Sequence, residues 1–177
     1  MCHFVILIAP TDDADAVRSI MERHGRAAYP ADNPSIRKVL QEGERQYVTT
    51  CGHCDCGTVL APRHDPPETF EEKLAKEAAR MKRKGWSEAK ITRAMEDRRK
   101  ADARPSGGGS DSLELWNSVV HVLRNELNLP YVGLFVRFYL GEIATEVFKA
   151  TRREVPKGTP WQDSLASLEH DEVTILR

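Results

Sequence analysis

The sequence predicts an α+β fold: a mostly antiparallel sheet of about five strands, covered by helices, with a charged helical-hairpin insertion. Short apolar or β-branched stretches alternate irregularly with amphipathic stretches, which is typical of α+β proteins. The segment 69–104 differs from the rest because it is dense in Lys, Arg, Glu and Ala, which are good helix formers. A run of glycines, Gly107 to Gly109, follows this segment and is typical of a flexible linker.

Length and charge limit the classes of protein to consider. The chain has 177 residues and a formal net charge of −1. We expect residues 1–68 and 105–177 to form a single α+β domain, and 69–104 to be inserted into it. The near-neutral charge gives no reason to expect nucleic acid or a membrane as a partner of the whole chain. No apolar run reaches the length of a membrane span, so we expect a soluble protein in the reducing cytoplasm.

The first half of the chain begins with an apolar, β-branched run that Pro10 ends. Because this run is apolar on both faces, we expect a central strand. Thr11 to Asp13 can cap a following helix, which Gly25 would end. The predicted elements are a strand at 3–9, a helix from 11–13 to 24, a loop at 26–34, a short helix starting at Asn33-Pro34, a strand at 45–50 and a short strand at 59–61.

The second half begins with the charged segment, which Gly85-Trp86-Ser87 divides into two helices. After the glycines, Asp111 or Ser112 can cap a helix with a strong apolar face. Alternating apolar residues then predict a strand, and Gly141-Glu142 fits a two-residue hairpin turn. The predicted elements are helices at 69–84 and 87–103, a helix from 111 or 112 to 127, strands at 131–140 and 146–155, with 143–150 alternatively helical, and a terminal strand at 172–176.

All four cysteines lie in two places. Three of them stand in the run Cys51-Gly52-His53-Cys54-Asp55-Cys56-Gly57, and the fourth is Cys2. Cys-x-x-Cys spacing allows two thiolates to converge on one ion when the chain turns, and glycines permit tight turns. We therefore predict a metal site, with zinc as the ion, and Cys2, Cys51, Cys54, Cys56 and His53 as candidate ligands.

Whether Cys2 joins this site depends on strand direction. Cys2 precedes the first predicted strand, and Cys51 follows the strand at 45–50. If these strands are parallel neighbours, the length of a strand, roughly 20 Å, separates Cys2 from the loop. If they are antiparallel, the two ends meet. We favour the antiparallel arrangement because it places all four thiols together.

Two kinds of thiol-dependent enzyme are alternatives to a metal site. The tetrapeptide Cys51-Gly52-His53-Cys54 resembles the active-site motif of protein disulfide isomerases, in the thioredoxin family, which implies a dithiol oxidoreductase acting through Cys51 and Cys54. If Met1 is removed, Cys2 carries both a thiol and a free amine, which resembles N-terminal nucleophile amidohydrolases. That resemblance implies a hydrolase with Cys2 as the nucleophile.

The charged segment 69–104 is a candidate partner surface. Another protein is the partner that we expect there. The basic run Met81-Lys82-Arg83-Lys84 lies beside Trp86, so a phosphate backbone is an alternative partner. The sequence thus predicts a zinc-binding protein that acts as a binding or interaction module, and it names no biological role or oligomeric state.

Overall fold

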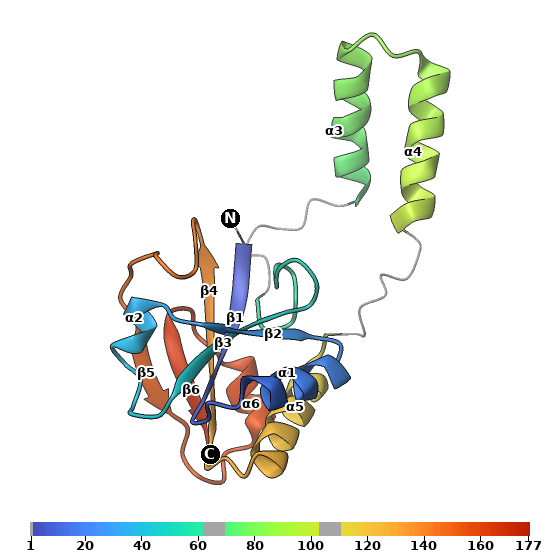
Figure 1. Cartoon of the computed structure of the whole chain (residues 1–177). Helices are drawn as coiled ribbons and strands as arrows, with labels where there is room; N and C mark the ends of the chain where they lie inside the picture. The colour runs from blue at the N-terminus through green and yellow to red at the C-terminus, as the bar shows by residue number, and fades with distance from the viewer. Residues whose placement is uncertain (1, 62–69, 103–110) are drawn as a thin grey trace. The chain divides into compact units, whose positions relative to one another are not determined.

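The computed structural model describes residues 2–61, 70–102 and 111–177. They fall into two compact units, one built from the N-terminal and C-terminal parts of the chain and one from its middle (Figure 1). The smaller unit contains α3 (Phe70–Arg83) and α4 (Glu88–Asp102). The larger unit contains β1 (Cys2–Ala9), α1 (Ala14–Arg23), β2 (Ala27–Ala31), α2 (Pro34–Arg37), β3 (Arg45–Thr50), α5 (Leu113–Glu126), β4 (Val132–Tyr139), β5 (Thr151–Glu154), α6 (Trp161–Ala166) and β6 (Glu172–Leu176).

The larger unit is organised around a six-stranded sheet with the order β2-β3-β1-β4-β6-β5. Neighbouring strands are antiparallel except β5 and β6, which are parallel. The predicted α+β content and mostly antiparallel sheet are therefore confirmed in outline. The sheet is mixed and has six strands instead of about five.

Strand β1 occupies the centre of the sheet, as its continuous apolar run predicted. It pairs with β3 along one edge and with β4 along the other. Val5 and Leu7 are buried on one face, and Ile6 and Ile8 are buried on the other. A strand that is buried on both faces needs apolar residues at successive positions, and β1 has them.

The two faces of the sheet are covered differently (Figure 1). One core lies between the sheet and helices α1, α5 and α6, and its largest side chain is Trp116, which is fully buried. The second core lies under α2 and the segment 143–150, where Phe148 packs on Phe135 with ring centroids 5.7 Å apart. Helices therefore cover one face, whereas a short helix and an irregular segment cover the other.

Strand β2 corrects the prediction of a loop at 26–34. Its residues, Ala27-Ala28-Tyr29-Pro30-Ala31, have weak strand preference, but the segment pairs antiparallel with β3 from Ala27↔Thr50 to Ala31↔Gln46. Pro30 cannot donate a ladder hydrogen bond, and β2 is an edge strand, where this loss is tolerated. Tertiary pairing, rather than local preference, makes this segment a strand.

The predicted hairpin at 131–155 is wrong. β4 ends at Tyr139, and the N–H groups of Leu140 and Gly141 donate to the Glu146 carboxylate at 2.8 and 2.9 Å. Arg137 also pairs with Glu146, at 2.9 Å. The chain leaves the sheet here and returns as β5, which pairs with β6 and not with β4.

Two smaller differences concern short segments. Residues 59–61 form no strand, because the chain turns there: the N–H of Gly57 donates to Ala61 O at 3.0 Å. Helix α6, between the predicted strands at 146–155 and 172–176, was not predicted. The other elements lie within a few residues of their predicted bounds, and 45–50 and 172–176 match β3 and β6.

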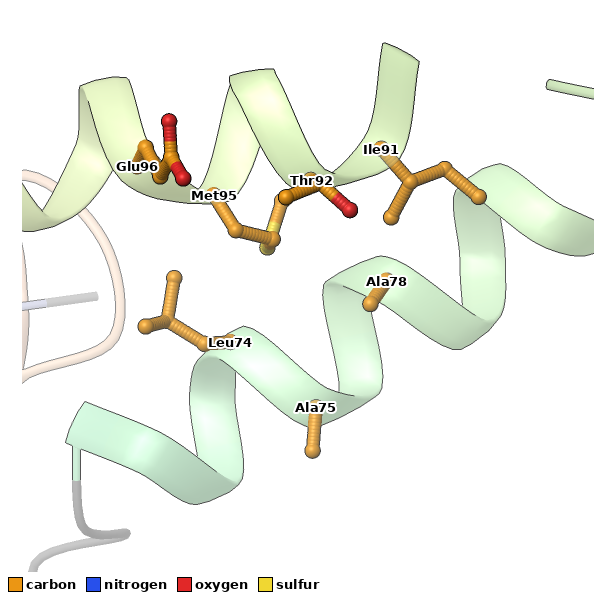
Figure 2. A pocket seen from close by; sticks show the side chains of 7 residues that line it. All are labelled: Leu74, Ala75, Ala78, Ile91, Thr92, Met95 and Glu96. Atoms are coloured by element: carbon orange, nitrogen blue, oxygen red, sulfur yellow. The ribbon is translucent and has the colours of Figure 1, made fainter. Parts of the chain in front are cut away.

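The smaller unit consists of α3 and α4. Leu74 and Met95 are buried between the two helices, and Figure 2 shows them pointing toward each other. A groove of about 330 Å³ lies between the helices and is lined by Leu74, Ala75, Ala78, Ile91, Thr92, Met95 and Glu96. Residues 69, 103 and 104 lie outside those described, so the predicted hairpin insertion, and its domain bounds, stay predictions.

Deleting 69–104 is expected to leave a folded α+β unit. Both core clusters of the sheet are made of residues from 2–61 and 111–177 alone. The deletion variant should therefore unfold in one cooperative thermal transition, followed by circular dichroism beside the full-length protein. A gradual, non-cooperative melt of the deletion variant would contradict this expectation.

Gly133 tests how tightly the sheet packs on its second core. A Cβ atom added at Gly133 would lie 2.9 Å from Ile175 Cδ1 and 3.0 Å from Ile8 Cβ. We expect Gly133→Ala to lower the free energy of unfolding by about 1–3 kcal/mol, as overpacking does. Gly141→Ala is the control, because the nearest atom to its Cβ is Glu146 Oε2 at 4.0 Å. Equal urea midpoints for the two variants would show that the packing relaxes without cost.

Candidate metal centre

The cysteine loop docks on the edge of β1 beyond the end of β3. The pairing of β1 with β3 begins at Val5↔Thr49, so the first residues of β1 extend past it. There the N–H of Asp55 donates to His3 O at 2.9 Å, and the N–H of His3 donates to Cys56 Sγ at 3.1 Å. The segment 54–56 therefore takes the place beside β1 that β3 leaves. Figure 1 shows the loop after β3 curling beside β1.

Three sulfur atoms meet at this edge. The Sγ atoms of Cys2, Cys54 and Cys56 all lie within 4.8 Å of one another, and all three residues are half-buried. Because β1 and β3 are antiparallel, the start of β1 lies at the end of β3, where the loop begins. The strand direction that we favoured from the sequence is the observed one, and it brings Cys2 to the loop.

The other two candidate ligands lie outside this sulfur cluster. Cys51 is half-buried and His53 is exposed, and neither belongs to the group of Cys2, Cys54 and Cys56. Gly52, between them, has a φ of +99°, a conformation that suits glycine. The first cysteine of the Cys-x-x-Cys pair is thus not among the three whose sulfurs group together.

The end of the loop is fixed by its own backbone. The N–H of Thr58 and the Thr58 hydroxyl both donate to Asp55 O, at 3.1 and 2.8 Å. Gly57 has a φ of +84°, and its N–H donates to Ala61 O. This turn reverses the chain directly after Cys56, so that the side chains of Cys54 and Cys56 can both face Cys2.

Asp55, between the two clustered cysteines, is fully buried. Its carboxylate accepts the N–H of Val5 at 2.9 Å and forms an ion pair with Arg26. Burial raises the pKa of the Asp55 carboxyl, whereas the charge of Arg26 and the Val5 hydrogen bond act in the opposite direction. The carboxylate holds the loop on β1, because it satisfies an amide of that strand from inside the core.

Arg26 connects this carboxylate to α5. Its side chain is 1 % exposed and also pairs with Asp111 at 3.0 Å. Asp111 accepts the indole N–H of Trp116 at 3.0 Å and the N–H of Val59 at 2.8 Å. The Arg26 guanidinium lies 4.3 Å from the centre of the Trp116 ring. The loop is therefore held at two points. Arg26 pairs with the Asp55 carboxylate, and Asp111, which Arg26 and Trp116 hold in place, binds the N–H of Val59.

His3 directly follows Cys2 in the sequence, and its ring lies beside Cys56 of the cluster. The residue is 7 % exposed, and its Nδ1 lies 3.8 Å from Cys56 Sγ. Its ring centroid lies 4.9 Å from that of Phe138 and 5.3 Å from that of His170. The ring therefore packs against β4 and against the segment that precedes β6.

Sequence reasoning identified the thiols and missed the anchor. Asp55 stood in the motif only as a residue between two candidate ligands, and its burial was not predicted. Arg26 fell in a segment predicted as loop, and nothing in its local pattern indicates burial. Trp116 is buried on the apolar face of α5, and its indole N–H also donates to Asp111.

Neither enzyme resemblance is tested by this arrangement. All four cysteines are free thiols. The N-terminal nucleophile prediction concerns removal of Met1, which lies outside the described residues. Three half-buried thiols beside an imidazole can hold a soft or borderline metal ion, because thiolates favour such ions.

Comparisons with known proteins give no family for this chain: no family model, no curated protein and no solved structure matches it. Among residues 2–61, 70–102 and 111–177, no helix is both long enough and apolar enough to cross a membrane. The function proposed below is therefore argued from the arrangement of the site alone.

Arg26→Met is expected to destabilise the protein strongly. It leaves the Asp55 carboxylate buried without its charged partner, and breaking a buried pair in this way costs about 3–5 kcal/mol of unfolding free energy. Urea unfolding followed by tryptophan fluorescence measures the loss. The thiols of Cys54 and Cys56 should also react faster with a disulfide reagent, because the loop loses its anchor.

The matched control is Arg23→Met, three residues earlier. Arg23 pairs with Glu126 at 2.5 Å, but its side chain is 52 % exposed, so water and salt screen the interaction. The control should unfold at nearly the wild-type urea concentration. Equal losses for Arg23→Met and Arg26→Met would show that burial of the Asp55–Arg26 pair has no special role.

Proposed function

We propose that this protein binds one zinc ion through Cys2, Cys54 and Cys56 and acts as a metal-dependent binding or interaction module. One observation carries the proposal: three half-buried sulfurs from two distant segments lie within 4.8 Å of one another. Thiols that merely fill a core have no reason to gather at one strand edge. The cluster is instead placed by a loop with its own turn and its own buried ion pair.

Zinc is the ion that this donor set favours in a reducing compartment. It is borderline soft, has no redox chemistry and accepts tetrahedral thiolate sites with Zn–S distances of about 2.3 Å. The hydrogen bond from the His3 N–H to Cys56 Sγ supports this proposal, because such bonds stabilise the negative charge of a bound thiolate. Cys51 and His53 remain candidates only if the loop rearranges, since neither joins the sulfur cluster.

The proposal predicts that metal content depends on three cysteines and not on the fourth. Protein purified under reducing conditions without chelator should carry about one zinc per chain by elemental analysis. Cys2→Ser, Cys54→Ser and Cys56→Ser should each weaken zinc binding by more than the ~10–100-fold typical of outer-sphere changes. Cys51→Ser is the matched control from the same loop and should bind zinc as the wild type does.

Cobalt substitution gives a second measurement of the same site. Tetrahedral thiolate-bound cobalt shows sulfur-to-metal charge-transfer bands and visible d–d bands, which the Cys51→Ser control should retain. Wild-type protein that holds no metal while all four thiols titrate rapidly would overturn the proposal. A Cys51–Cys54 disulfide that forms readily in that metal-free protein would support the dithiol oxidoreductase instead.

A partner for the segment 69–104 stays a prediction. The described part of that segment exposes Trp86 beside the basic residues Lys82, Arg83 and Lys84, and Lys90 lies 4.0 Å from the centre of the Trp86 ring. Another protein and a phosphate backbone both suit such a surface, so the contacts favour neither.

A further inference from the structure

We infer that Cys2, Cys54 and Cys56 together bind trivalent arsenic, supplied as arsenous acid, and that Cys51 takes no part. The inference rests on the same three sulfurs as the proposed zinc site, but it does not require zinc to bind. It adds a ligand of a different class, a thiophilic trivalent metalloid. It also selects against the Cys-x-x-Cys pair, which is the dithiol that the sequence pattern alone would assign to such a ligand.

The number of sulfurs in the cluster matches the valence of the element. The Sγ atoms of Cys2, Cys54 and Cys56 lie within 4.8 Å of one another. Trivalent arsenic forms three bonds to sulfur and keeps a lone pair in the remaining direction. As–S bonds are about as long as the Zn–S bonds of about 2.3 Å, which places three sulfurs on one arsenic atom roughly 3.5 Å apart. Small movements of the three side chains therefore complete an arsenic complex.

The exchange needs only arsenous acid and three thiols, and all four cysteines of the chain are free thiols. Three As–O bonds and three S–H bonds break, three As–S bonds form, and each hydroxyl group leaves with a thiol proton as water. Arsenic remains trivalent throughout, so no oxidant or reductant enters the reaction. The three clustered cysteines are half-buried, so that a small neutral molecule can reach their sulfurs.

The charges that anchor the loop favour a neutral product. Arg26 lies between the carboxylates of Asp55 and Asp111, which leaves one negative charge in excess. Three thiolates carry a net negative charge when they bind a zinc ion and no net charge when they bind trivalent arsenic. Partial burial and nearby carboxylates both disfavour a further negative charge. The arsenic complex adds none.

The docked loop holds Cys56 near Cys2. The N–H of His3 donates to Cys56 Sγ at 3.1 Å, and the N–H of Asp55 donates to His3 O at 2.9 Å. These bonds keep Cys56 beside the start of β1, where Cys2 lies. Cys51 is not in the group of three sulfurs. Arsenic bound by Cys51 and Cys54 would therefore first have to draw one of these two thiols away from its observed place.

Arsenic binding ties the start of β1 covalently to the loop after β3. A cross-link between residues that are distant in the sequence restricts the unfolded chain more than the folded one. Arsenite should therefore raise the temperature of thermal unfolding. Cys51→Ser should show the same increase as the wild type, whereas Cys2→Ser should lose it.

Thiol mapping on the chelator-treated wild-type protein is the direct test. Without arsenite, N-ethylmaleimide should label all four cysteines. With one equivalent of arsenite it should label Cys51 alone, and mass spectrometry should show one arsenic per chain with the loss of three hydrogens. Cys2→Ser, Cys54→Ser and Cys56→Ser should each weaken arsenite binding by about 100-fold or more, because each removes one of three bonds made within one site. Cys51→Ser is the matched control and should bind as the wild type does.

Three results would overturn the inference. The first is wild-type protein that takes up no arsenic. The second is protection of Cys51 and Cys54 while Cys2 is labelled, which would assign arsenic to the Cys-x-x-Cys pair. The third is a Cys51→Ser variant that loses as much affinity for arsenite as Cys54→Ser. The mapping uses wild-type protein, so it decides the outcome even if a variant does not fold.

Failure of the zinc proposal has a different signature. Wild-type protein that binds no zinc, but in which arsenite protects Cys2, Cys54 and Cys56, would overturn the zinc function and support this inference. Wild-type protein that carries zinc, but takes up no arsenic after the zinc is removed, would overturn this inference and leave the zinc function standing.

Discussion

The buried guanidinium of Arg26 is the group on which the candidate site depends. It lies between the carboxylates of Asp55 and Asp111, and the ring of Trp116 covers it. A charge at such depth is tolerated only where its partners are also fixed, so each of these groups requires the others. The loop, the start of β1 and the N-terminal end of α5 are joined in this way into one rigid corner.

The position of the thiol cluster follows from strand direction and strand length together. β1 is longer than its paired stretch with β3, which leaves free backbone at the start of β1. The returning loop uses this backbone for two hydrogen bonds to His3. A β3 longer by three residues would fill the same edge and leave no room for Cys56. The site exists because one strand ends early.

The parts of the fold that could be predicted are those set by local pattern. The apolar run of β1, the β-branched residues of β3 and the Asn33-Pro34 start of α2 each carry their own signal, and the structure confirms them. The side chain of Asn33 caps α2 by accepting the N–H groups of Ser35 and Ile36. In the site, the concentration of cysteines at 51–56 indicated where thiols gather, and antiparallel geometry brought Cys2 there; the Cys-x-x-Cys spacing pointed to Cys51, which is not in the sulfur cluster.

The parts that could not be predicted are set by distant partners. β2 is a strand because β3 pairs with it, although alanine and proline favour other structures. The segment after Tyr139 leaves the sheet because Glu146 binds its N–H groups, and no turn pattern encodes that contact. Arg26 is buried for the same reason: its partner Asp55 lies on a loop that only tertiary structure brings near.

The strand order has a consequence for synthesis on the ribosome. β1 is made first, yet its second neighbour, β4, lies beyond residues 10–131. At about 5–20 residues per second, one edge of the most apolar strand in the sheet therefore has no partner for at least several seconds. During that interval β3 and its cysteine loop can close only the other edge. The nascent chain must accordingly protect a hydrophobic strand edge until its C-terminal third emerges.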